Sequence, residues 1–364
     1  MKILTLLCFP WCIWAASRYD QTRIENQNIS MCALVQSTNL HNLFSEWNCI
    51  DMMPQSNPCS WTGVSCNNSV VVYIDVPNYN IIGSIPSALG NLMNLQVLDL
   101  DGNYLSSTIP TAIGSLGLLT YLNLLGNEFS SSIPREIGNL SSIVYLIMSS
   151  NFFSSSIPST IGLLSSLAYL DLSLNYFKSA IPHSIGNLTK ITDLELYSNQ
   201  LSAAIPSSLA LLSSLQYLNL ADNRLTSSIP TSLGYLTNIL NLNMGQNALT
   251  SSIPTTFGLF RSISYLRMSY NRIRRSIPTT IGHLSSLIFL SLFSNYITGY
   301  IPSTIGYLTS LTLLNLGQNS LSGTIPSTIR YLLLPIQIII TIIISHPLSD
   351  SYHSFLLWLS ITTI

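Results

Sequence analysis

The stretch Leu95-Gln-Val-Leu-Asp-Leu-Asp-Gly-Asn103-Tyr-Leu-Ser-Ser-Thr-Ile-Pro110 decides the fold, because its pattern returns along the chain at a constant interval. With x for a variable residue, the pattern is L-x-x-L-x-L-x-x-N-x-L-x-x-x-I-P. Its asparagine recurs without a slip from Asn103 to Asn319, and its proline from Pro86 to Pro326. A strict period of this kind means that the chain stacks copies of one supersecondary unit.

The apolar residues of the pattern form columns that no single unit can bury. One column is the isoleucine before each proline, from Ile109 to Ile325, and another is the central leucine, from Leu98 to Leu314. Stacked neighbours give each column a continuous core. The short L-x-L stretch has period two and predicts a strand of a parallel sheet. The asparagine after it predicts a sharp turn whose backbone groups are satisfied by the asparagine side chain.

The remainder of each unit predicts irregular structure. The Ile-Pro step forbids a regular helix, so an extended or 3₁₀-like segment is expected there. A glycine four residues after most prolines, such as Gly186, is expected to permit the next bend. The serines before each Ile-Pro, as in residues 154–156, predict a second hydrogen-bonded ladder on the side of the stack.

This repeat resembles the plant-type leucine-rich repeat of plant receptor-like kinases, receptor-like proteins and polygalacturonase-inhibiting proteins. The usual form L-S-G-x-I-P stands intact at Leu321–Pro326, while Ser or Ala usually replaces that glycine elsewhere. The resemblance implies an α/β repeat fold, a right-handed leucine-rich repeat solenoid. Its 24-residue repeats would place a curved parallel β-sheet on the concave face and 3₁₀ or irregular structure on the convex side. Because such repeats host many binders, function has to be inferred from the surface.

The segment ahead of the repeats resembles the N-terminal cap of the same family. Trp47-Asn48, followed by Cys59-Ser-Trp-Thr-Gly-Val-Ser-Cys66, matches W-N and then C-x-W-x-G-V-x-C. Such a cap covers the apolar face that an end repeat exposes. The resemblance implies a Cys59–Cys66 disulfide, with Trp61 packing against the first strand, and leaves Cys32 and Cys49 as a second pair. Four cysteines can pair in three ways, and a zinc site is the alternative.

Both ends of the chain are apolar. Met1-Lys2, the short apolar run Ile3–Trp14 and small residues before Arg18 are typical of a secretory signal peptide. The predicted organisation is a signal peptide at 1–17, the cysteine-containing cap at 18–70, eleven leucine-rich repeats at 71–334 and a hydrophobic tail at 335–364.

The tail leaves three alternatives open. A membrane helix needs about 20 apolar residues, and the run from Tyr331 to Ser345 supplies fewer. Ser349-Asp350-Ser351 ahead of Phe355–Ile364 fits a lipid-anchor signal loosely. An aberrant C-terminus is the third alternative, and membrane association through the tail depends on which of these holds.

Secretion would make the N-glycosylation sequons meaningful. They begin at Asn28, Asn67, Asn139 and Asn187, and the last two occupy equivalent positions two repeats apart.

Composition excludes several classes of function. Only 7% of the residues are charged and the net charge is −1, which argues against nucleic acid as a partner. No kinase signature and no catalytic constellation stands in the sequence. The chain is therefore predicted to be no enzyme and to need no cofactor or metal.

A ligand is expected on the residues that point out of the concave sheet. Tyrosine recurs six places before the asparagine, where it suits an interface; the alternative is that stacked aromatics only stabilise neighbouring strands. Binding is favoured for Tyr197, Phe289 and Phe293, which depart from their columns. The full set of candidates is Tyr121, Tyr145, Tyr169, Asp193, Glu195, Tyr197, Tyr217, Tyr265, Arg267, Arg272, Phe289 and Phe293.

Charges cluster within these repeats. Five of the 13 basic residues fall in one repeat, with Arg267 expected on the concave face and Arg272 beside its edge. A peptide carboxylate, a sulfate or an acidic sugar is expected to pair with them. Asp193 and Glu195 share a strand three repeats away, and they are expected to be exposed, with no pocket to shift a pKa.

Together these features predict an extracellular binding protein, secreted or on the extracellular face of the plasma membrane. Its ligand would be a peptide or protein, with a co-receptor as a further partner, as the resemblance to receptor-like ectodomains implies. The alternatives are a soluble inhibitor of a cell-wall-degrading enzyme, resembling polygalacturonase-inhibiting proteins, and a fragment of a receptor-like kinase.

Overall fold

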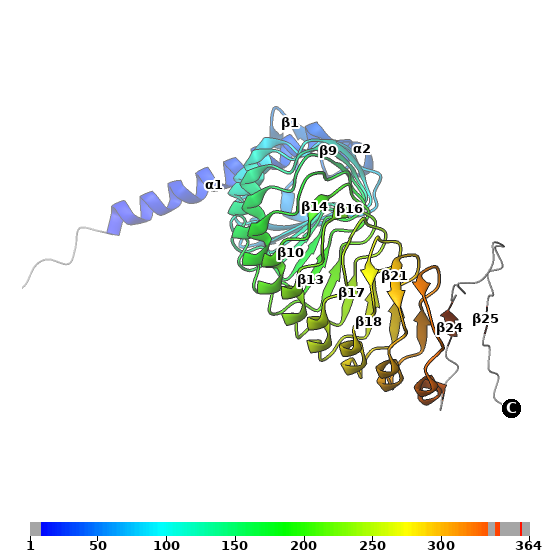
Figure 1. The fold of residues 1–364 in the computed structure, drawn as a ribbon. Helices are drawn as coiled ribbons and strands as arrows, with labels where there is room; N and C mark the ends of the chain where they lie inside the picture. Colours follow the sequence, from blue (N-terminus) through cyan, green and yellow to red (C-terminus); the bar gives the residue numbers. More distant parts are fainter. Residues whose placement is uncertain (1–8, 334–338, 343–356, 359–364) are drawn as a thin grey trace, which may run out of the picture. The chain divides into compact units, whose positions relative to one another are not determined.

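The computed structural model describes residues 9–333, 339–342 and 357–358 of the 364-residue chain (Figure 1). The described residues fall into two compact units, divided between Tyr145 and Leu146. In both units short strands alternate with 3₁₀ helices, written η below. The predicted leucine-rich repeat solenoid is confirmed.

The first unit carries the predicted cap and the first repeats. It opens with α1 (Phe9–Ser37) and α2 (Leu40–Leu43). The other elements are β1 Cys49–Ile50, β2 Met53–Pro54, η1 Pro58–Ser60, β3 Val64–Asn67, β4 Val70–Asp75, β5 Ile82–Gly83, η2 Ser87–Asn91, β6 Val97–Asp99, β7 Tyr104–Ser107, η3 Thr111–Ser115, β8 Tyr121–Asn123, β9 Glu128–Ser131 and η4 Arg135–Asn139. Strands β4, β6 and β8 pair in parallel, and β3 pairs antiparallel with β4.

The second unit continues the repeat, with 3₁₀ helices along one side of a parallel sheet (Figure 1). The strands of this sheet are β12 Tyr169–Asp171, β13 Asp193–Glu195, β15 Tyr217–Asn219, β17 Asn241–Asn243, β18 Tyr265–Arg267, β20 Phe289–Ser291, β22 Leu313–Asn315 and β24 Ile339–Ile342, after β10 Tyr145–Ile147 at the boundary. The lateral strands are β11 Phe152–Phe153, β14 Ser202–Ala204, β16 Arg224–Thr226, β19 Arg274–Arg275, β21 Tyr296–Gly299 and β23 Ser320–Leu321. The 3₁₀ helices are η5 Ser159–Leu163, η6 His183–Asn187, η7 Ser207–Leu211, η8 Thr231–Tyr235, η9 Thr255–Leu259, η10 Thr279–His283, η11 Ser303–Tyr307 and η12 Ser327–Leu333.

The strands of the main sheet pair in register, which builds the predicted columns. Leu194 lies opposite Leu218, and Leu218 opposite Leu242, all three almost fully buried. The isoleucine column is buried as well, with Ile205 and Ile229 no more than 3% exposed. Each unit shields the apolar residues of the next, so the core runs along the stack.

The asparagine column satisfies the turns that follow the strands. The Asn199 Oδ1 atom accepts a hydrogen bond from the backbone N–H of Phe177 at 3.0 Å. Its Nδ2 atom donates to the carbonyls of Leu172, Leu196 and Tyr197 at 3.0, 3.2 and 3.2 Å. The same pattern recurs at Asn223, Asn247, Asn271, Asn295 and Asn319. The structural role predicted for this column is confirmed.

A lateral ladder also forms, and it explains the glycine of L-S-G-x-I-P. The N–H of Ser202 donates to the carbonyl of Ser179 at 2.8 Å. In this ladder Gly323 has a φ of +78°, while Ser179 and Ser227 both have +67°. The left-handed region suits glycine and costs other L-residues about 1–2 kcal/mol. The repeats with serine at this position therefore carry local backbone strain.

The glycines after the prolines have a different role from the predicted one. Gly186 and Gly234 lie inside η6 and η8, and their φ angles are not positive. A Cβ atom would lie 2.5 Å from the carbonyl oxygen of Ser208 at Gly186, and 2.3 Å from that of Thr256 at Gly234. The predicted role of these glycines, conformational freedom at a bend, is therefore wrong. Glycine is needed there because the absence of a side chain lets successive 3₁₀ helices pack closely.

The cap contains two disulfides, Cys59–Cys66 as predicted and Cys32–Cys49 as the second pair. The alternative of a zinc site is wrong, because all four sulfur atoms are used in these bonds. Trp61 is buried, with its ring centroid 4.9 Å from that of Trp47.

The sequence did not predict α1, which continues across the expected signal-peptide boundary at residue 17. The Gln27 side chain accepts from the N–H of Val71 at 2.8 Å, and Ser30 donates to the carbonyl of Ala88 at 2.7 Å. The C-terminal part of the helix is thereby attached to β4 and η2.

The tail is described only in part. Strand β24 pairs in parallel with β22, with Ile339 opposite Leu313. These two residues are further apart in the sequence than Phe289 and Leu313, which are opposite each other in the preceding strand pair. Strand β25 (Leu357–Trp358) pairs antiparallel with β24. The other residues of 335–364, and residues 1–8 of the predicted signal peptide, lie outside the described residues. Within the described ranges, no helix has both the length and the apolarity needed to cross a membrane.

Candidate functional site

The open face of the sheet consists of the outward side chains of the main strands. In each three-residue strand the middle leucine is buried and the two flanking residues point outward, as in Asp193-Leu-Glu195. The strands place these residues in columns, so that Asp171, Glu195 and Asn219 lie opposite one another. The predicted candidates on the strands therefore lie on this face.

The tyrosine column combines contact between neighbours with exposure. The ring centroids of Tyr121 and Tyr145 are 5.9 Å apart, and those of Tyr265 and Phe289 are 6.0 Å apart. Tyr145, Tyr217 and Tyr265 still have 47%, 39% and 46% of their surface exposed. These ring contacts support the stabilising role, and the exposed area leaves room for a partner.

The aromatic candidates Tyr197 and Phe293 lie in the turns just after β13 and β20. Phe293 makes an edge contact with Tyr270, with ring centroids 5.3 Å apart. Tyr197 is half-buried and lies close enough to Tyr169 to contribute to its raised pKa. Burial and the carboxylates Asp171, Glu195 and Asp193 account for most of that shift, which takes the pKa of Tyr169 to about 12.

Glu195 differs from its prediction. Its Oε2 atom is buried and has no hydrogen-bond partner among the described residues. Burial raises the pKa of Glu195 from 4.5 to about 7, and the charges of Asp171 and Asp193 add to the effect, while a hydrogen bond with Asn219 opposes it. The expectation of an exposed carboxylate with an ordinary pKa was wrong, because the side chain lies mid-sheet between flanking strands.

Glu195→Gln should stabilise the protein at alkaline pH. A raised folded-state pKa means that the folded protein holds this proton more tightly than the unfolded chain. The resulting stability is present below pH 4.5 and is lost as the pH rises through about 7. Because the side chain is still partly solvated, we expect a gain of about 1–2 kcal/mol at pH 8 and almost none at pH 4.

Thermal unfolding of both proteins at the two pH values measures this difference. Glu128→Gln, the same change at an exposed glutamate, is the matched control. It should have the same effect on thermal unfolding at both pH values. An equal effect of Glu195→Gln at pH 4 and pH 8 would mean that packing, not ionisation, changed.

The arginine cluster divides between two surfaces. Arg267 is exposed on β18 of the open face, and Arg272 is exposed just after the turn. Arg274 and Arg275 form the lateral strand β19, with the Arg274 guanidinium 5.9 Å from the ring centroid of Tyr296. Only Arg267 is placed on the sheet to meet a ligand there.

Sequence reasoning missed a second acidic group, in the first unit. Asp75, Asp99 and Asp101 follow one another along β4, β6 and the turn after β6, with Asp75 opposite Asp99. Burial raises the pKa values of Asp75 and Asp101, and the charge of Asp99 raises them further. The constant repeat spacing, counted back from Asp99 to Asp75, is the signal that identifies this row.

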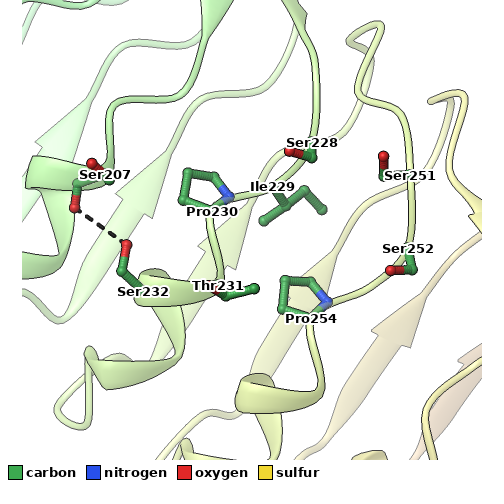
Figure 2. A pocket seen from close by; sticks show the side chains of 9 residues that line it. All are labelled: Ser207, Ser228, Ile229, Pro230, Thr231, Ser232, Ser251, Ser252 and Pro254. Atoms are coloured by element: carbon green, nitrogen blue, oxygen red, sulfur yellow. Dashed lines mark hydrogen bonds between the residues drawn. The ribbon is translucent and has the colours of Figure 1, made fainter.

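Beside this row, a hollow of about 460 Å³ is lined by Val97, Thr120, Tyr121, Val144 and Tyr145. A second hollow, of about 480 Å³, lies away from the open face, where successive Ile-Pro segments meet (Figure 2). Its walls are serine and threonine hydroxyls with Ile229, Pro230 and Pro254, and Ser232 donates to the carbonyl of Ser207 at 3.3 Å. That hydrogen bond belongs to a structural ladder which links η5 to η12.

The sequons occupy different environments. Asn67, Asn139 and Asn187 are exposed, the last two at the ends of η4 and η6. Asn28 is half-buried within α1, and Ser30 of its sequon is fully buried. Glycosylation at the four sites stays a prediction.

Three family models match the chain. The leucine-rich repeat N-terminal domain matches residues 29–67, and the leucine-rich repeat region matches residues 110–252. The single leucine-rich repeat matches residues 94–116, 262–284, 286–308 and 310–332.

Known proteins share this arrangement. A probable LRR receptor-like serine/threonine-protein kinase of Arabidopsis thaliana is 34% identical over 101 residues, which are 27% of this chain and 12% of the kinase. The ectodomain of the Arabidopsis receptor kinase HAESA, solved with an IDA peptide hormone, is 32% identical, with a TM-score of 0.70 over 84% of this chain and 52% of that chain. A leucine-rich repeat protein of Leptospira interrogans is 31% identical, with a TM-score of 0.56 over 69% of this chain and 68% of that chain.

The chain therefore spans about half of the solved receptor ectodomain and about an eighth of the kinase. The family models nevertheless match both the cap and the repeats, and the solved structures match the fold. The chain belongs to the leucine-rich repeat family, with an N-terminal cap of the plant type, and is related to the ectodomains of leucine-rich repeat receptor-like kinases.

Proposed function

We propose that this chain is an extracellular, receptor-like binding protein that recognises a peptide or protein on the open face of its sheet and catalyses no reaction. The related HAESA ectodomain was solved with a peptide hormone, and PEPR1, 29% identical to this chain, was solved with AtPEP1. Two disulfides in the cap support an oxidising, extracellular location. A co-receptor and membrane association through the tail belong to the same proposal.

One observation carries the proposal: side chains of opposite charge lie on one open face of the second unit. Asp193 and Glu195 are on β13, and Arg267 is on β18, three strands further along the sheet. Three strand spacings amount to about 14 Å, which four or five residues of an extended peptide can span. A short segment with charges of both signs therefore matches this face.

Arg267→Glu should weaken ligand capture about tenfold or more, because a charge-assisted contact becomes a repulsive one. A randomised peptide library displayed on phage and selected on the full chain supplies the ligands. Biolayer interferometry at low and high salt measures their affinity. The loss should shrink as salt rises, since salt screens exposed charges, and thermal stability should not change.

Arg261→Glu is the matched control, because it makes the same charge change at an exposed position after η9, away from the strands. A tenfold loss of ligand affinity in Arg267→Glu, with the affinity of Arg261→Glu unchanged, supports the proposal. Equal losses in both variants would point to non-specific attraction, and no loss in either would exclude the open face around Arg267 as the binding surface.

A further inference from the structure

The apolar hollow on the first unit has features of a side-chain pocket. Val97 and Val144 supply aliphatic walls, and the rings of Tyr121 and Tyr145 stand 5.9 Å apart beside them. All of these residues come from the starts of successive strands or from the positions just before them. Its volume of about 460 Å³ is enough for one long side chain.

The end of the hollow at Tyr121 lies next to the acidic row. The hydroxyl of Tyr121 accepts a hydrogen bond from the Nδ2 atom of Asn123 at 3.3 Å, and burial together with the charge of Asp99 raises the pKa of this tyrosine. Asp99 accepts from Asn123 at 3.3 Å and from the N–H of Asp101 at 3.1 Å. The carboxylate is thus oriented by neutral donors, which leave its negative charge uncompensated.

The neighbouring strands reinforce this charge. Asp75 lies opposite Asp99 in the sheet, and Asp101 follows two residues later. Strands β4, β6 and β8 lie wholly within the described residues, and no lysine or arginine occurs in them. Burial, and after it the charge of Asp99, raises the pKa values of Asp75 and Asp101. A bound cation would relieve the repulsion between these carboxylates.

We propose that this hollow and the carboxylates of Asp75, Asp99 and Asp101 bind an arginine side chain of a polypeptide ligand, an assignment that deepens the proposed function and rests on it. Charge complementarity selects a cation, and the apolar walls select one with a long methylene stem. A planar guanidinium stacks on tyrosine rings and pairs with carboxylates, whereas an ammonium does so less well. An arginine therefore satisfies the walls, the rings and the acidic end together.

The probe is the blocked pentapeptide acetyl-Gly-Gly-Arg-Gly-Gly-amide, compared with its citrulline analogue, which has the same shape but no charge. Saturation-transfer difference NMR on the full chain measures binding in the millimolar range. We expect transfer to the arginine methylenes and an affinity at least about fivefold lower for the citrulline peptide. Equal binding of both peptides would overturn the proposal.

Two substitutions test whether the arginine peptide binds in this hollow. Asp75→Asn changes an exposed side chain and should lower the affinity for the arginine peptide several-fold, and Tyr145→Ser should do the same by removing one ring. Asp222→Asn and Tyr235→Ser are the matched controls, at exposed positions on the second unit. Unchanged binding in both test variants, with their melting temperatures preserved, would overturn the assignment.

Two further results separate this site from its alternatives. Displacement of the peptide by micromolar Ca²⁺ at constant ionic strength would make the row a metal site and overturn the arginine assignment. If the arginine peptide binds here but the phage library yields no ligand, the pocket stands and the proposed function fails. If the library yields ligands that Arg267→Glu weakens but Asp75→Asn and Tyr145→Ser do not, the proposed function stands and this pocket fails.

Discussion

Asn199→Ala should lower the free energy of unfolding by about 3 kcal/mol. The substitution removes one acceptor and one amide donor, which together serve four backbone groups at 3.0–3.2 Å. An unpaired buried polar group costs about 1–3 kcal/mol, and the N–H of Phe177 loses the side-chain acceptor it has in the native state. Guanidinium unfolding followed by circular dichroism measures the change.

Asn238→Ala is the matched control. Asn238 makes one hydrogen bond, from its Nδ2 atom to the carbonyl of Ser213 at 2.8 Å, at an exposed position. Water replaces such a bond, so a loss below about 0.5 kcal/mol is expected. Equal losses in the two variants would mean that the half-buried Asn199 contributes no more than a surface amide.

Removing the Cys32–Cys49 disulfide by Cys32→Ser with Cys49→Ser should cost about 3 kcal/mol. The bond closes a loop with a sequence separation of 17 and joins α1 to β1. Most of the effect arises in the unfolded chain, which gains conformational freedom when the loop is opened. We also expect α1 to be cleaved more readily by protease, since its remaining attachments to the first repeat include the contacts of Gln27 and Ser30.

The pair Cys59→Ser with Cys66→Ser is the comparison for this prediction. Its loop has a sequence separation of only 7, so a smaller loss of about 2 kcal/mol is expected. Calorimetry of the three proteins, with secreted yield as a second measurement, tests the order. A larger loss for the shorter loop would show that local contacts around Trp61, and not loop closure, dominate the stability of the cap.

The fold was predictable because each repeat carries the same constraints. The constant period places Leu194, Leu218 and Leu242 in one column, and the sheet register follows it. The asparagine turns and the lateral ladder were predictable for the same reason. Where the period breaks, prediction failed: α1 lies before the first repeat, and Ile339 pairs with Leu313 beyond the expected step.

The candidate site was predictable in position but not in chemistry. Counting from each asparagine placed Glu195 and Arg267 on the open face, where the structure has them. The same counting could not show that one oxygen of Glu195 is buried, or that Arg274 faces Tyr296 on a different surface. Burial and ring contacts depend on side chains from adjacent repeats, which lie one full period apart in the sequence.

The sequence by itself determined the repeat, its strands and turns, and the family of the cap, because these follow from spacing along the chain. The tertiary structure alone decided the raised pKa of Glu195 and the hollow near Asp99, and it settled which cysteines pair with Cys32 and Cys49 among the three possible pairings. The physical reason is that pairing, desolvation and cavity shape depend on distances through space between side chains. A regular repeat specifies where each backbone segment lies, and the variable residues that meet across the stack decide what each surface can bind.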